Sequence, residues 1–105
     1  MTADYRLATN LGDLKQGGIT SVEVNGRFLA FYLVDGQPYC TEDSCTHEGM
    51  PISNGGYVDG DEVECAWHGA RFNVRTGGPA RYPASYPLRT FPVQVRDGQV
   101  YVAID

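Results

Sequence analysis

Runs rich in Val, Ile, Phe and Tyr alternate with turn signals along most of the chain. Four dipeptides of the hairpin-turn type separate these runs: Asn25-Gly26, Asp35-Gly36, Asp59-Gly60 and Asp97-Gly98. An Asn-Gly or Asp-Gly pair between two such runs is the signature of a β-hairpin. The pattern predicts strands over residues 19–24, 27–34, 37–42, 63–65, 71–76, 91–96 and 100–104.

No segment keeps apolar residues at helical spacing for three turns, and residues 10–18 have room for one helical turn at most. The predicted fold class is therefore all-β, with an antiparallel β-sandwich framework. The length of 105 residues suits a single domain. The centre of the chain is rich in Gly, Pro, Asn and Ser. This composition predicts an insertion of functional loops, at about residues 43–84, in a framework formed by residues 1–42 and 85–105.

The formal net charge of −5 argues against nucleic acid binding, because phosphates require a basic surface. An acidic surface suits a partner with a basic face, although many acidic proteins use their charge only to stay in solution. The start of the chain has neither the basic nor the apolar region of a secretory signal. The longest apolar run, residues 28–34, is too short to span a bilayer. We therefore expect a soluble, cytoplasmic protein with no membrane contact.

Both histidines and two of the three cysteines form two tight pairs, Cys45-x-His47 and Cys65-x-x-His68, with 17 residues between the pairs. Three cysteines do not make the even, dense set of a secreted disulfide framework, so metal binding is the better interpretation. Two thiolates and two imidazoles hold either one zinc ion or a [2Fe–2S] cluster. Paired zinc ligands are commonly two to four residues apart, which the first pair does not match. Mixed pairs favour a cluster in which one iron takes both cysteines and the other both histidines.

The spacing Cys-x-His-x17-Cys-x2-His, followed by Gly69, resembles the Rieske iron–sulfur motif. From "YCTEDSCTHEGMPISNGGYVDGDEVECAWHGARFNVRTG" to "FPVQVRDGQVYV", the chain is similar to the small Rieske ferredoxins of bacterial aromatic-ring-hydroxylating dioxygenase systems. The resemblance implies the Rieske fold, with the central insertion as the cluster-binding subdomain. It also implies one [2Fe–2S] cluster, held by Cys45, His47, Cys65 and His68.

The function that this resemblance implies is one-electron transfer in aromatic hydrocarbon catabolism. Such a carrier takes electrons from a flavin-dependent ferredoxin reductase, which uses NADH or NADPH, and passes them to a terminal oxygenase. It has no catalytic site of its own, and we expect it to be a monomer when free.

Two departures from the respiratory branch of Rieske proteins indicate the low-potential branch. The respiratory branch has an additional cysteine in each cluster loop, where this chain carries Met50 and Trp67. It also has a Ser and a Tyr whose hydroxyls donate toward the cluster, and the matching positions here are Ala70 and Phe72. Donors to the cluster sulfurs raise the potential, so their absence lowers it.

Six residues are expected to shield the cluster or to dock partners: Gly49, Met50, Trp67, Gly69, Tyr82 and Pro83. Gly49 and Gly69 suit the tight turns that two facing loops need. Residues 82–84 are expected to close over the cluster as a third loop. Trp67 either packs beneath its own loop or meets a partner, because both roles are common for tryptophan.

Cys40 and the acidic residues near the motif receive ordinary structural interpretations. Cys40 has no histidine beside it and is expected to fill the core. The acidic residues are expected to be mostly solvated surface, with some of them orienting a basic reductase: Asp43, Glu48, Asp59, Asp61, Glu62 and Glu64.

Several alternative functions share some of these sequence features. Within the family, the carrier could serve a di-iron aromatic monooxygenase, or the chain could be a nitrite-reductase small subunit. A structural zinc module without redox activity is the alternative from another class. A Rieske domain cut from an oxygenase large subunit would need a mononuclear iron site with two further histidines. Both histidines of this chain are already assigned to the cluster, so the sequence does not support the oxygenase hypothesis.

Overall fold

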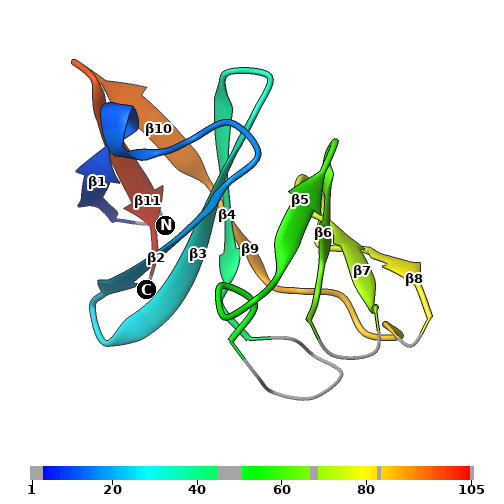
Figure 1. The fold of residues 1–105 in the computed structure, drawn as a ribbon. Coiled ribbons are helices and arrows are strands. Elements are labelled where there is room, and N and C mark those ends of the chain that lie inside the picture. Colours follow the sequence, from blue (N-terminus) through cyan, green and yellow to red (C-terminus); the bar gives the residue numbers. More distant parts are fainter. Residues whose placement is uncertain (1–3, 45–50, 67–68, 83, 105) are drawn as a thin grey trace.

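A computed structural model of the chain describes residues 4–44, 51–66, 69–82 and 84–104 (Figure 1). The described residues form three sheets, and every strand pair within them is antiparallel. The predicted all-β class is therefore confirmed. In the described part of the chain no helix is long and apolar enough to cross a membrane.

The first two sheets take strands from both ends of the chain. One has the order β1 (Tyr5–Asn10), β11 (Gln99–Ala103) and β10 (Val93–Arg96). The other has the order β2 (Ile19–Val24), β3 (Arg27–Val34), β4 (Gln37–Glu42) and β9 (Thr90–Phe91).

The third sheet contains four short strands that are consecutive in the sequence. Its order is β5 (Tyr57–Asp59), β6 (Glu62–Glu64), β7 (Arg71–Asn73) and β8 (Pro79–Arg81). It lies to one side of the other two sheets in the view of Figure 1. Residues Leu11–Asp13 form a single 3-10 turn. This agrees with the prediction of at most one helical turn in residues 10–18.

The hairpin turns explain why three strands match their predicted bounds residue for residue. Asn25, Asp35 and Asp97 have φ angles of 53°, 51° and 50°, and each precedes a glycine that also has positive φ. Such turns match the twist of antiparallel strands and fix the register of β2, β3 and β4. The fourth turn lies one residue later than predicted, because Asp59 pairs with Glu62 and leaves Gly60 and Asp61 as the turn residues.

Other strand bounds differ from those predicted. The predicted strand at residues 91–96 is divided by Pro92, which has no N–H to donate to a ladder, so β9 and β10 join different sheets. The strand predicted at 71–76 ends at Asn73. Those predicted at 63–65 and 100–104 begin and end one residue earlier. β1, β5 and β8 were not predicted at all.

Strand β3 is buried on both faces and joins two hydrophobic clusters. Leu29 and Phe31 face a cluster that packs the first sheet against the second, as a β-sandwich requires. Ala30 and Tyr32 face a second cluster, which includes Ile52, Cys65 and Phe72 together with Val34, Val63, Ala70, Val74 and Leu88. Cys65, which directly follows β6, is therefore in the same hydrophobic cluster as Ala30 and Tyr32, two alternate residues on one face of β3.

Candidate metal centre

Only part of the predicted site lies in the described residues. Of the four predicted ligands, Cys65 is described, and Cys45, His47 and His68 lie outside the described residues. Of the six shielding or docking residues, Gly69 and Tyr82 are described. The remaining four lie outside the described residues: Gly49, Met50, Trp67 and Pro83.

Cys65 lies directly after β6 on a turn closed by the backbone. Its N–H donates to the carbonyl oxygen of Ala70 at 2.8 Å, and the chain then enters β7. Gly69 has a φ of +72°, a backbone conformation that glycine adopts without strain. The side chain of Cys65 is 1% exposed and packs in the same cluster as Ile52 and Phe72. The thiol of Cys65 thus lies in an apolar environment between β6 and β7, where a metal ligand would be shielded from water.

The donor set of the chain fits a Rieske cluster. One thiol is already buried at the end of β6, and the sequence supplies a second thiol and two imidazoles within the same two loops. Sulfur and imidazole nitrogen are the ligands that Rieske iron takes. The positions beside the second pair, Ala70 and Phe72, are fully buried and have no polar side-chain atom. The described side of the site is therefore apolar.

The stems of the first cysteine–histidine loop are fixed by described residues. After β4, the N–H of Asp43 donates to the carbonyl oxygen of Phe28 at 3.0 Å. On the other side, Ile52 is 1% exposed, and its carbonyl accepts the N–H of Gly56 at 3.1 Å. A side chain at Gly56 would place its Cβ 2.3 Å from that same carbonyl oxygen, so the turn requires glycine.

A row of side chains crosses all four strands of the third sheet, one residue before Cys65. Tyr57, Glu64, Arg71 and Arg81 are successive cross-strand partners. The guanidinium of Arg71 donates to Glu64 at 2.8 Å and lies over the ring of Tyr57, and Arg81 reaches Glu64 at 3.2 Å. The hydrogen bond from Arg71 lowers the pKa of Glu64, and the same bond raises the pKa of Arg71. These contacts hold β5–β8 together as one sheet, and the sheet fixes the position of the β6–β7 hairpin, whose connection begins at Cys65.

This row adds ion pairs to acidic residues that were expected to be mostly solvated surface, and the side chain of Asp59 is 65% exposed, as expected. Arg71 also reaches Asp59 at 3.1 Å and Glu62 at 3.3 Å, so these carboxylates are paired within the sheet. Asp43, expected at the solvated surface, is 7% exposed and hydrogen-bonded instead. The sequence could not show either arrangement, because the partners come together only through cross-strand register and loop closure.

Cys40 is in the other hydrophobic cluster, between the two framework sheets. Its side chain is 2% exposed, and burial raises the pKa of its thiol. The interpretation of Cys40 as a core residue is confirmed.

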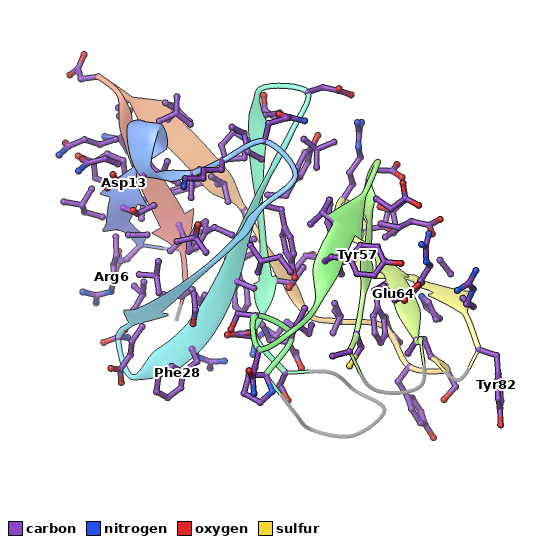
Figure 2. All side chains as sticks on the ribbon, viewed as in Figure 1. Arg6, Asp13, Phe28, Tyr57, Glu64 and Tyr82 are labelled. Atoms are coloured by element: carbon purple, nitrogen blue, oxygen red, sulfur yellow. The ribbon has the colours of Figure 1, made fainter. Side chains whose placement is uncertain are left out.

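Tyr82 lies at the opposite extreme of exposure, at 89%, just beyond the end of β8. Figure 2 shows its side chain projecting away from the third sheet into solvent.

The comparisons with known proteins agree with this geometry. The family model of the Rieske [2Fe-2S] domain matches residues 5–92. The ferredoxin component of a p-cumate 2,3-dioxygenase system from Pseudomonas putida is 42% identical over 88% of this chain and 79% of its own length. Ferredoxin CarAc from Metapseudomonas resinovorans is 48% identical over 87% of this chain and 85% of its own length.

Two solved structures are also similar over nearly all of the chain. A ferredoxin of Sphingomonas yanoikuyae B1 superposes with a TM-score of 0.91 at 31% identity, covering 97% of this chain and all of its own. A chain from a complex of reduced oxygenase and oxidised ferredoxin in carbazole 1,9a-dioxygenase gives 0.87 at 44% identity, covering 94% of this chain and 92% of its own. The chain therefore belongs to the Rieske [2Fe–2S] family, as one of its ferredoxins, which are electron carriers with one such cluster and are not enzymes themselves.

Proposed function

We propose that this protein carries single electrons from an NAD(P)H-dependent flavin reductase to the terminal oxygenase of an aromatic-ring dioxygenase system. The observation that carries the proposal is similarity over 88–97% of the chain to ferredoxin components of p-cumate, naphthalene and biphenyl dioxygenases. A chain 44% identical to this one is part of a complex with its oxygenase. Because reductases of this kind draw on NADH or NADPH, the protein is proposed to work in the cytoplasm.

The proposed ligands are Cys45 and Cys65 for one iron, and His47 and His68 for the other. When bound, the cluster supplies reversible one-electron oxidation and reduction. Residues 43–84 are proposed to be the cluster-binding subdomain. Within it, Cys65 is supported as a ligand by its burial and by the backbone hydrogen bond that closes its turn. Ala70 and Phe72 exclude water from the described side of the site.

A reconstituted electron-transfer chain tests the function. The protein, a flavin reductase and a ring-hydroxylating oxygenase are combined with NADH, and product formation is measured with and without the protein. We expect product only when all three proteins are present. A colourless protein with one zinc and no inorganic sulfide would contradict the proposal. Turnover only with a di-iron monooxygenase would contradict the assignment to a dioxygenase system.

The reduction potential is predicted to lie near the bottom of the Rieske range, which spans roughly −150 to +300 mV. Ala70 and Phe72 donate no hydroxyl hydrogen bond, and such donors stabilise the more negative state. The double variant Ala70→Ser, Phe72→Tyr should raise the midpoint potential by on the order of 100 mV, since a hydrogen bond to a charged group contributes about 1.5–3 kcal/mol and 59 mV is tenfold for one electron. Protein-film voltammetry measures both values. A strongly positive midpoint in the parent protein would contradict the prediction.

A further inference from the structure

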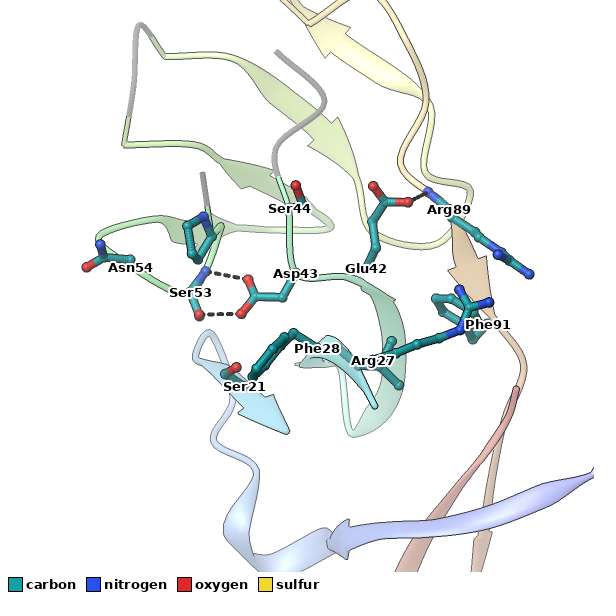
Figure 3. A pocket seen from close by; sticks show the side chains of 12 residues that line it. Ser21, Arg27, Phe28, Glu42, Asp43, Ser44, Ser53, Asn54, Arg89 and Phe91 are labelled. Atoms are coloured by element: carbon teal, nitrogen blue, oxygen red, sulfur yellow. Dashed lines mark hydrogen bonds between the residues drawn. The ribbon is translucent and has the colours of Figure 1, made fainter. Parts of the chain in front are cut away.

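Asp43 is a buried carboxylate in a position where a surface charge was expected. It follows β4 directly, precedes Cys45 by two residues, and is 7% exposed. Both of its oxygens are used, because Oδ1 accepts the backbone N–H of Ser53 at 2.8 Å and Oδ2 accepts the Ser53 hydroxyl at 2.5 Å (Figure 3). Buried Asp side chains are rare unless they are paired or hydrogen-bonded in this way.

The backbone of Asp43 and the backbone of Ser53 are each held in place by other contacts. The N–H of Asp43 donates to Phe28 of β3, which continues the ladder between β3 and β4. Ser53 follows Ile52, which is anchored in the same hydrophobic cluster as Cys65. The N–H of Asn54 donates to the carbonyl of Pro51 at 3.2 Å, which fixes the turn that holds Ser53. The side chains of Asp43 and Ser53 therefore join two rigid stems.

The segment between the two stems carries the first cysteine–histidine pair, Cys45 and His47. Joining the stems shortens the free part of the chain, which removes conformations that a ligand loop could otherwise sample. Hydrogen bonds made directly to metal ligands are typically worth 10- to 100-fold in metal affinity, and the Asp43–Ser53 contact acts one step further out, on the backbone that carries the ligands. The contact therefore preorganises half of the proposed ligand set before any metal arrives.

The charge of Asp43 has a second consequence. Its Cα is at most about 7.6 Å from that of Cys45, because two trans peptides span no more than twice 3.8 Å. A buried negative charge two residues along the chain from a proposed ligand is poorly screened by solvent. It opposes the addition of an electron nearby and so lowers the reduction potential.

We propose that Asp43, held by Ser53, is a positioning residue for the first ligand loop and that its carboxylate lowers the reduction potential. This inference rests on the proposed assignment of Cys45 and His47 as ligands. A contact that served only the stability of the fold would leave the potential unchanged, so the potential separates the two roles.

Three variants and one control test the proposal. Asp43→Ala removes both hydrogen bonds and the charge, and Ser53→Ala removes the hydroxyl bond and keeps the charge. Asp43→Asn removes only the charge, because an amide accepts the Ser53 N–H and donates to its hydroxyl. Asp97→Asn is the control: it makes the same charge change at an exposed turn position with a φ of 50°, which asparagine tolerates. The midpoint potential is measured by voltammetry, and cluster loss to an iron chelator is followed by visible absorbance.

We expect Asp43→Ala to lose its cluster at least 10-fold faster than the parent protein, Ser53→Ala to lose it several-fold faster, and Asp43→Asn to restore nearly the parent rate. Asp43→Asn should raise the midpoint potential, whereas Asp97→Asn and Ser53→Ala should not. Equal cluster loss in Ser53→Ala and the parent overturns the positioning role, even if Asp43→Ala does not fold. Equal midpoints in Asp43→Asn and Asp97→Asn overturn the electrostatic role.

Different measurements would show that the proposed ligands or the proposed function are wrong. If Cys45→Ser keeps an intact cluster, the ligand assignment is wrong and the inference falls with it. If the parent protein holds the cluster but exchanges electrons with neither a reductase nor an oxygenase, the comparison of the Asp43 variants with the parent still decides the inference.

Discussion

Cys65→Ser is expected to abolish the iron–sulfur spectrum and to lower the melting temperature of the protein steeply. Cys65 is buried in the hydrophobic cluster that joins β3 to the third sheet, so the metal bond that we propose for it would tie that sheet to the framework. Metal binding is coupled to folding, and structural metal sites contribute roughly 10–16 kcal/mol in small zinc domains. Loss of one ligand in a small β protein should therefore cost both the cofactor and much of the stability. Visible absorbance, iron and sulfide content, and thermal unfolding measure the three effects.

Cys40→Ser is the matched control, because it makes the same chemical change at an equally buried site. Cys40 lies in the other hydrophobic cluster, between the two framework sheets. The spectrum should stay intact, and a buried hydroxyl in place of a thiol should cost about 1–3 kcal/mol of unfolding free energy at most. A colourless Cys40→Ser protein, or a Cys65→Ser protein with a complete spectrum, would show that the ligands are assigned wrongly.

The framework could be predicted from the sequence where apolar runs and turn chemistry coincide. The run at β3 is apolar on both faces, and Asn25-Gly26 and Asp35-Gly36 flank it, so β2, β3 and β4 were found with correct bounds. β8 could not be found in this way, because its three residues, which begin with Pro79, are all exposed. It is a strand because of pairing with β7, and such tertiary contacts override local propensity.

The candidate site shows the same division between local and tertiary information. Ligand spacing is a local property, so the two cysteine–histidine pairs were recognisable in the sequence. The burial of Asp43 was not, because an acidic residue predicts solvent exposure and its hydrogen-bond partner is ten residues away. The row of Glu64, Arg71 and Arg81 was missed for a related reason, since only the strand register makes these residues neighbours.

Tyr82→Glu is expected to slow electron exchange with both the reductase and the oxygenase by about 10- to 100-fold, with little change in the midpoint potential. Tyr82 is 89% exposed and follows β8, beside Pro83 of the proposed docking residues. Exposed aromatic residues are typical of the desolvated centre of protein interfaces. An unpaired carboxylate that stays partly solvated in the complex should cost about 1.4–2.8 kcal/mol of binding free energy, which corresponds to the expected factor because about 1.4 kcal/mol is tenfold.

Leu7→Glu supplies the matched control, because it adds the same charge at another exposed apolar side chain. Leu7 is 52% exposed on β1, which lies on the far side of the molecule from β8 (Figure 1). Stopped-flow rates for each partner, with parent, Tyr82→Glu and Leu7→Glu proteins, separate a local effect from a change in net charge. We expect the Leu7 variant to match the parent protein with both partners.

The comparison between the two partners also tests whether one face serves both. The proposed ligands fall within residues 45–68 of the sequence, so we expect the reductase and the oxygenase to approach the cluster in turn by the same face. If Tyr82→Glu slows only one partner, the two proteins dock on different faces. If it slows neither, Tyr82 is outside the docking face, and the electrons enter and leave by another surface.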